Sequence, residues 1–247
     1  TDYSEIAINT VQDEKIWMMF DSIVAVSDDC TEIFSTAYPA LRTKTSTIEN
    51  ILSKEFVEKQ AREYSSEEMS GDESIKLLSV GRFCFAKAFD FAAEVCRRLI
   101  DDGMKVKWYL IGYGTDEQLI REKIQELSLE DHFIILGKKS NPYPYISACD
   151  IYIQPSRYEG KAVTVREAQM LGKPVVITDY KTAHTQVKNG FDAIVSPMKA
   201  LALANNIMRL AQSDLLRNTL SANTQSSDYS NSNHMERIYA LIEDEGE

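Results

Sequence analysis

The sequence predicts an α/β fold built on a Rossmann-like parallel sheet with helices on both faces. From Ile75 onward, short apolar runs alternate with longer amphipathic segments, which is the pattern of parallel strands joined by crossover helices. The apolar runs lack the polar alternation of a half-exposed strand, as expected when helices cover both faces of a sheet. The predicted strands span residues 75–80, 106–111, 133–136, 151–153, 174–178 and 193–195. The predicted helices between and after them span residues 89–101, 117–127, 144–148, 163–171, 183–188, 200–211 and 214–223.

The two ends of the chain carry weaker signals. The predicted elements there are a helix at 11–20, strands at 22–27 and 45–49, and helices at 30–36, 54–64 and 234–242. Asp28 and Asp29 are expected to cap the helix that follows them, and Pro39 ends it. The segment SSEEMSGDES, within residues 51–74, is acidic and poor in apolar residues, so we expect an exposed linker there.

Composition and charge exclude several classes of protein. The chain has 247 residues, of which 44% are hydrophobic and 26% charged, as is ordinary for a globular protein that buries a core. Its net charge of −11 disfavours a nucleic-acid partner, because clustered Lys and Arg bind phosphate backbones. No apolar run approaches the roughly 20 residues of a transmembrane helix, and the polar, acidic start is unlike a secretory signal. The four cysteines and three histidines are scattered, which favours reduced thiols and predicts no metal site.

The stretch PSRYEGKAVTVREAQMLG, residues 155–172, combines a Gly-containing loop with the start of a helix. In an open parallel sheet such loops lie at the carboxyl ends of strands, where ligands bind, and a helix N-terminus suits a phosphate. Two acids in the stretch, Glu159 and Glu167, would be separated by about 12 Å on one continuous helix. Carboxylates that cleave a glycosidic bond together lie roughly 5–9.5 Å apart. The spacing is therefore poor for hydrolysis and suits an elongated polar ligand held at two ends. In the structural alternative, Glu159 is an acid at a helix N-terminus and Glu167 is a solvated surface acid.

A second loop, directly after the strand at 75–80, carries two cations. Gly81 permits close approach to the backbone at the strand end, and Arg82 and Lys87 follow it. An arginine fork and a lysine point charge both suit a diphosphate, and fixed cations stabilise a leaving diphosphate as it gains charge. Surface cations that extend their stems over the protein are the structural alternative.

Two further strand ends carry glycines or a cation. The strand at 106–111 is followed by Gly112 and Gly114, without the third glycine of a GxGxxG fingerprint, so a nicotinamide dehydrogenase is disfavoured. A tight structural turn explains these two glycines equally well. Lys138 follows the strand at 133–136 and is a candidate ligand contact, with a solvated surface cation as the alternative.

Taken together and in this order, these loops resemble those of retaining glycosyltransferases with the GT-B architecture, family 4 in particular. The stretch 155–172 is similar to the Glu-x7-Glu motif of that family, and the resemblance covers most of the chain. It implies two Rossmann-like domains, of which the C-terminal one binds a nucleotide-diphosphate sugar. Two such domains need roughly 300 residues or more, so we expect the donor-binding half and a remnant of the other. The implied parts are a remnant of the N-terminal acceptor domain (1–50), a linker (51–74), the nucleotide-sugar-binding domain (75–226) and a C-terminal helix (227–247).

The resemblance also implies roles for individual residues. Arg82 and Lys87 would hold the pyrophosphate and stabilise the departing nucleotide, and Glu159 would contact the donor sugar, so these three are the implied catalytic residues. Glu167 would bind the ribose hydroxyls. The other implied donor-binding residues are Gly81, Gly112, Gly114, Lys138, Gly160, Lys161, Ala162 and Val163.

Within that set, Gly160, Lys161 and Ala162 would offer backbone N–H groups near the sugar and the diphosphate. Here the sequence departs from the commonest pattern of the family, in which an aromatic or apolar residue and then Gly or Pro stand at the last two positions. The departure leaves the donor sugar open and allows Lys161 to meet an acidic or phosphorylated group. Arg157, in the same loop, is given no ligand role. The alternative for this residue is an ion pair with a nearby acid.

The implied function is transfer of a sugar, with retention, from a nucleotide-diphosphate sugar to a saccharide, lipid-linked or protein acceptor in bacterial polysaccharide or glycoconjugate synthesis. The implied enzyme is of hexosyltransferase type, needs no metal or other cofactor, and is cytoplasmic or peripheral at the inner face of the membrane. It would depend on the missing N-terminal domain or on a partner chain. Two alternatives stay open: a non-catalytic subunit that stabilises a partner glycosyltransferase, and a sugar-nucleotide epimerase of related architecture.

Overall fold

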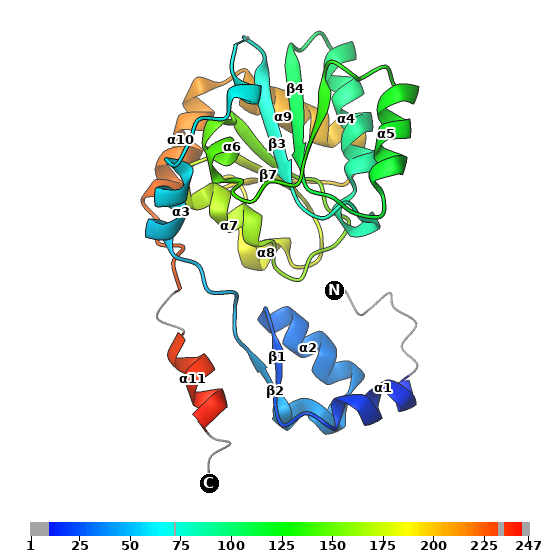
Figure 1. Cartoon of the computed structure of the whole chain (residues 1–247), viewed down its shortest axis with the longest axis vertical. Helices are drawn as coiled ribbons and strands as arrows, with labels where there is room; N and C mark the ends of the chain where they lie inside the picture. Colours follow the sequence, from blue (N-terminus) through cyan, green and yellow to red (C-terminus); the bar gives the residue numbers. More distant parts are fainter. Residues whose placement is uncertain (1–9, 72, 232–234, 244–247) are drawn as a thin grey trace. The chain divides into compact units, whose positions relative to one another are not determined.

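The computed structural model describes residues 10–71, 73–231 and 235–243 (Figure 1). The chain forms two compact units, here called the larger and the smaller unit. The larger unit is Lys54–Tyr158 with Ala162–Tyr229, and the smaller unit is Thr1–Ser53 with Glu159–Lys161 and Ser230–Glu247.

The larger unit is built on a six-stranded, fully parallel sheet in the order β5-β4-β3-β6-β7-β8. The strands are β3 (Ile75–Val80), β4 (Val106–Ile111), β5 (Phe133–Gly137), β6 (Ile151–Gln154), β7 (Val175–Thr178) and β8 (Ile194–Ser196). The chain lays down β3, β4 and β5 in one direction and then returns to the other side of β3 for β6. The carboxyl ends of β3 and β6 therefore flank a topological switch point, the place where such sheets bind ligands. The predicted Rossmann-like parallel sheet is confirmed.

Helices cover both faces of this sheet, as predicted (Figure 1). One face is covered by α4 (Phe89–Asp101), α5 (Glu117–Glu126) and α9 (Ala200–Ala211), and the other by α6 (Tyr143–Ala148), α7 (Val163–Met170) and α8 (Ala183–Gln186). The remaining elements of the unit are α3 (Lys54–Ala61), η2 (Glu67–Met69), η3 (Phe85–Lys87) and α10 (Asp214–Gln225). None of the helices in the described part of the chain is long and apolar enough to cross a bilayer.

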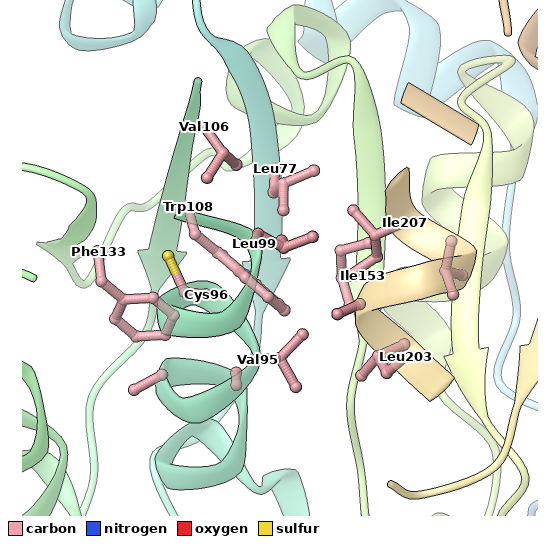
Figure 2. Close-up of a cluster of buried hydrophobic side chains, with 14 of the residues drawn as sticks. Leu77, Val95, Cys96, Leu99, Val106, Trp108, Phe133, Ile153, Leu203 and Ile207 are labelled. Atoms are coloured by element: carbon pink, nitrogen blue, oxygen red, sulfur yellow. The ribbon is translucent and has the colours of Figure 1, made fainter. Parts of the chain in front are cut away.

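Figure 2 shows the larger apolar core, which fills the space between the sheet and the helices α4 and α9. Trp108 of β4 is fully buried in it, and its Nε1 donates to Ser79 Oγ at 3.0 Å. Ser79 Oγ in turn donates to the carbonyl oxygen of Ile153 at 2.7 Å. One polar relay thus joins β4, β3 and β6 inside the core, with the hydrogen bonds that buried polar groups require. It holds β3 against β6 directly below the switch point.

The smaller unit contains a short parallel pair of strands and several helices. These elements are α1 (Thr10–Trp17), β1 (Ile23–Ala25), α2 (Asp28–Ala37), η1 (Pro39–Lys44), β2 (Thr45–Thr47) and α11 (Met235–Glu243). The cap of α2 is Ser27, whose side chain accepts a hydrogen bond from the Cys30 N–H at 3.2 Å. Asp28 and Asp29, the expected caps, instead occupy the first turn, where acids are also favoured by the helix dipole. His234, the predicted start of the last helix, lies outside the described residues.

Residues 51–74 were expected to form a linker, and from Lys54 onward the described residues group with the larger unit. The helix α3 packs against α6 and α7, and Met69 of η2 is only 2% exposed. The acidic charge of this segment is partly paired, since Glu68 Oε1 lies 2.8 Å from Lys139 Nζ. Most of the described residues in 65–74 are exposed, whereas Ser66 and Met69 are buried, and a linker role for this segment stays a prediction.

Candidate functional site

The loops that follow β3 and β4 run side by side past the ends of the strands. The Phe83 N–H donates to the Tyr113 carbonyl oxygen at 2.9 Å. Two glycines permit this approach: a Cβ at Gly112 would lie 1.9 Å from the Gly81 carbonyl oxygen, and one at Gly114 would lie 2.2 Å from that of Phe83. Backbone packing therefore accounts for both glycines, and a contact between them and a donor stays a prediction.

Both predicted cations lie on the loop between β3 and α4. Arg82 is exposed directly after the strand, and Lys87 is partly buried at the end of η3. A Cβ at Gly81 would lie 3.3 Å from Lys87 Cε, so the lysine stem lies across the end of β3. The structure therefore brings Gly81, Arg82 and Lys87 to one strand end at the switch point.

The residue after Lys87 has a strained backbone. Ala88 is buried at the N-cap of α4 with φ 55° and ψ 42°, in the left-handed region. This conformation costs a non-glycine residue roughly 1–2 kcal/mol. Strain of this kind gathers at functional sites, where the surrounding structure holds it in place. The tight turn at Ala88 ends η3, begins α4 and fixes the backbone that carries Lys87.

The end of β6 is a buried polar cluster that joins the switch point to α7. Gln154 Nε2 donates to Ser156 Oγ at 2.9 Å, and Thr178 Oγ1 donates to the Ser156 carbonyl oxygen. Thr164 Oγ1, in the first turn of α7, lies 3.3 Å from Gln154 Oε1 and 3.5 Å from the Val80 carbonyl oxygen. The N-terminal turn of α7, which Val163 opens, is thereby held against the ends of both β3 and β6.

The backbone before α7 is held by a glutamine that the sequence did not single out. Gln186 Nε2 donates to the Ala162 carbonyl oxygen, and the Ala162 N–H donates to Gln186 Oε1 at 3.2 Å. Tyr180 OH donates to the same Oε1 at 3.1 Å. The Ala162 N–H, expected to be open to a ligand, is thus engaged within the protein. No sequence signal marked Gln186, which lies 24 residues away on a different element.

Glu167 is a buried carboxylate on α7, with 8% of its surface exposed. Tyr143 OH donates to its Oε1 at 2.9 Å, and no other described residue donates to this side chain. Burial raises the pKa of the Glu167 carboxyl, and the hydrogen bond from Tyr143 offsets part of that rise. Glu167 is therefore an internal acid held from one side and not the surface acid of the structural alternative.

Lys138 lies near the turn after β4. Its Nζ is 5.1 Å from the centroid of the Tyr113 ring, so a cation–π contact joins the loops after β5 and β4. Tyr113 stands between Gly112 and Gly114, and the structure thus brings Lys138 to the loop of both glycines.

Glu159, Gly160 and Lys161 group with the smaller unit. Lys161 forms an ion pair there with Glu49, so its ammonium group has a partner within the protein. The approach of these three residues to a ligand at the carboxyl edge stays a prediction.

The larger unit therefore places two cations, a buried carboxylate and the first turn of α7 on the loops and helices that follow its strands. Across the described residues, no three His, Cys, Asp or Glu side chains are grouped closely enough to hold a metal ion. Cations suit phosphate oxygens, and a carboxylate suits hydroxyl groups. A ligand with both kinds of group matches this arrangement.

Relatives of this chain are glycosyltransferases by name. An uncharacterized glycosyltransferase of Methanocaldococcus jannaschii is 26% identical over 175 residues, which is 68% of this chain and 42% of the relative. The amylovoran biosynthesis glycosyltransferase AmsK of Erwinia amylovora is 30% identical over 149 residues, 57% of this chain and 37% of the relative. The chain thus spans less than half the length of each of these relatives.

Solved structures share the fold. Alr3699/HepE of Anabaena, solved in complex with UDP, has a TM-score of 0.80 at 17% identity, and the match covers 97% of this chain and 69% of that one. A glycosyltransferase from Rickettsia africae has a TM-score of 0.77 at 18% identity, with 95% and 67% covered. These neighbours have the GT-B architecture that the sequence predicts. The family described as glycosyl transferases group 1 matches residues 60–227, well over half of the sequence, and this chain belongs to that family.

Proposed function

We propose that this chain is the donor-binding half of a retaining, metal-independent glycosyltransferase that uses a nucleotide-diphosphate sugar. The observation that carries the proposal is the loop between β3 and α4, which brings Arg82 and Lys87 to one strand end at the switch point. Two fixed cations at that place match the charge of a diphosphate. The acceptor, a saccharide, lipid-linked or protein hydroxyl, is bound by another domain or chain.

The names of relatives support a role in bacterial polysaccharide or glycoconjugate synthesis. We propose that the enzyme acts in the cytoplasm or at the inner face of the membrane. AmsK is named for amylovoran biosynthesis. A Campylobacter jejuni relative, 27% identical over 143 residues, is named as an N-acetylgalactosaminyltransferase of a diphospho-undecaprenol substrate. A hexosyl-type donor is the matching proposal for this chain.

The proposed chemistry follows from where charge develops. When the bond between the anomeric carbon and the diphosphate oxygen breaks, its electron pair stays on the diphosphate. The acceptor oxygen bonds to the same carbon, and its proton passes to the diphosphate oxygen that has gained the electron pair. Arg82 and Lys87 stabilise the charge of the leaving diphosphate more than that of the bound donor, so they lower the barrier. Glu159 contacts the donor sugar in this proposal, with Gly160 and Lys161 beside it.

Glu167 takes the ribose hydroxyls in this proposal. One of its oxygens accepts the hydrogen bond from Tyr143, which leaves the other for a hydroxyl of the ligand. The burial of Glu167 makes such a bond stronger than at an open surface, because the local dielectric is low.

Calorimetric titration of the full chain with UDP, GDP, ADP and their glucose conjugates tests this function. We expect one diphosphate to bind best, and its monophosphate to bind at least about tenfold more weakly, because the cations meet both phosphates. Glu167→Ala should weaken the favoured ribonucleotide more than its deoxyribose analogue, whereas the exposed control Glu122→Ala should change neither. Absence of binding by every nucleotide, or equal affinity for mono- and diphosphates, would contradict the proposal.

The ribose contact also predicts a pH dependence. Only the ionised form of Glu167 accepts hydroxyl hydrogen bonds freely, so affinity for the favoured diphosphate should fall as the pH is lowered through the pKa of this carboxyl. Tyr143→Phe removes the bond that partly offsets the effect of burial on that pKa. The pKa then rises further, and the fall in affinity should begin at a higher pH in calorimetric titrations across the acidic and neutral range.

The control for this pH shift is Tyr145→Phe on the same helix. Tyr145 OH donates to Glu68 at 3.0 Å and not to Glu167. Titration of the ligand phosphates is common to all variants, so only the difference between variants reports on the protein. An identical pH profile in wild type and Tyr143→Phe would contradict the idea that the hydrogen bond from Tyr143 influences the ribose contact of Glu167.

A further inference from the structure

We propose that Arg157 is a positioning residue for the diphosphate contact. From the loop after β6 it holds the half of the β3–α4 loop that carries Lys87, and it thereby sets where the lysine ammonium group meets the ligand. The inference rests on the proposed function, because it requires Lys87 to contact a diphosphate.

Arg157 contacts the loop through both its backbone and its side chain. Its N–H donates to the Ala86 carbonyl oxygen at 2.8 Å, and its Nη1 donates to the Phe85 carbonyl oxygen at 2.7 Å. Its guanidinium carbon lies 4.2 Å from the centroid of the Phe85 ring. Phe85 and Ala86 are the two residues directly before Lys87, so a single residue holds the backbone on which that lysine is carried.

Asp90 completes the attachment from the first turn of α4. Arg157 Nη1 lies 3.0 Å from Asp90 Oδ1, and Nη2 lies 2.7 Å from Oδ2, which is a bidentate, charge-assisted pair. The two side chains are only 22% and 27% exposed, so water screens the pair less than at an open surface. Burial raises the pKa of Asp90, but the hydrogen bonds and charge of Arg157 outweigh burial and leave that pKa below its ordinary value.

The two attachment points lie on either side of Lys87. Phe85 and Ala86 precede it, Asp90 follows it, and the strained Ala88 lies between. A left-handed alanine persists only where its surroundings hold it, and Arg157 contacts the chain both before and after this turn. The start of the loop is held separately, by the Phe83 N–H bond to the loop after β4, so that contact does not replace Arg157.

The same contacts distinguish positioning from ligand binding. Both terminal nitrogens of the Arg157 guanidinium group donate within the protein, and its charge is balanced by Asp90. A cation engaged in this way adds little attraction for a diphosphate. Its effect on the ligand therefore passes through the position of Lys87.

A double-mutant cycle tests the inference on the full chain, with calorimetric affinity for the favoured diphosphate among UDP, GDP and ADP as the readout. Arg157→Ala should weaken that affinity by about tenfold and leave the matching nucleoside unchanged. In a Lys87→Ala background, Arg157→Ala should have almost no further effect. Arg157→Lys should recover part of the affinity, because lysine can pair with Asp90 but cannot bridge both attachment points.

The control is Arg121→Ala, which removes an arginine that pairs with Glu117 at 2.7 Å on α5; it should leave diphosphate affinity unchanged. Asp90→Asn, which keeps the size of the side chain, provides the same test if Arg157→Ala does not fold. Equal losses in the wild-type and Lys87→Ala backgrounds, or no loss at all, would overturn the inference while the proposed function stands. A wild-type chain that binds none of the three diphosphates would instead overturn the proposed function, and the inference with it.

Discussion

Replacing Gly112 by alanine is expected to lower the free energy of unfolding by about 2–6 kcal/mol. Gly112 has φ 152°, a conformation that L side chains rarely adopt, and strain of that kind costs roughly 1–3 kcal/mol. The added Cβ would also lie 1.9 Å from the Gly81 carbonyl oxygen. That oxygen belongs to backbone, so relief requires a shift of the whole β3–α4 loop. Urea unfolding followed by circular dichroism measures the loss.

Gly81→Ala is the matched control on the opposite side of the same contact. Its φ lies outside the left-handed region, and the nearest neighbours of an added Cβ are the Lys87 stem at 3.3 Å and the Phe89 ring at 3.5 Å. A lysine stem can move, so we expect a loss of at most about 1 kcal/mol in unfolding free energy. If the two substitutions lower the unfolding free energy equally, the close backbone approach does not explain why position 112 requires glycine.

The sequence predicted the sheet well because its strands are buried on both faces. The strands β3 and β4 have the bounds that their apolar runs indicated, and α4 and α9 have the bounds that their periodicity indicated. Each strand end can be located in the sequence, because it is the point at which an apolar run stops. The glycines and cations that follow the strand ends could therefore be placed in order from the sequence alone. Parallel connectivity then brings Gly81 and Gly112 to one edge without further information.

What the sequence missed has a common cause, which is that a local pattern does not report distant partners. The acidic segment before β3 gave no sign that Glu68 pairs with Lys139, 71 residues away. The Ala162 N–H was expected to be open because the side chain that occupies it belongs to Gln186.

The same limit applies to the residues that support the candidate site. Arg157 and Asp90 are 67 residues apart, and Tyr143 and Glu167 are 24 apart. The sequence marked Glu167 as a candidate and left Arg157 without a ligand role. Which acid pairs with Arg157, and which hydroxyl holds Glu167, depends on the strand order at the switch point, where β6 lies beside β3.

Replacing Lys87 by alanine is expected to weaken binding of the favoured diphosphate among UDP, GDP and ADP by about 1.5–3 kcal/mol, because it removes a charge-assisted hydrogen bond. That loss corresponds to roughly 10–150-fold in the dissociation constant. Arg82→Ala should fall in the same range. Calorimetry at constant ionic strength measures both, since exposed charges are screened by salt.

The surface cation Lys123, which pairs with Glu126 on α5, provides the control for the lost charge. Lys123→Ala makes the same change in net charge and should leave affinity unchanged, so a loss confined to Lys87→Ala and Arg82→Ala reflects local contact with phosphate. Unaltered affinity in both variants would refute the assignment of the β3–α4 loop. Because negative charge grows on the diphosphate as the glycosidic bond breaks, Lys87→Ala should reduce turnover of the complete enzyme more than it weakens donor binding. If the lysine only anchors the donor, its removal should lower donor affinity and kcat/KM by the same factor and leave kcat unchanged.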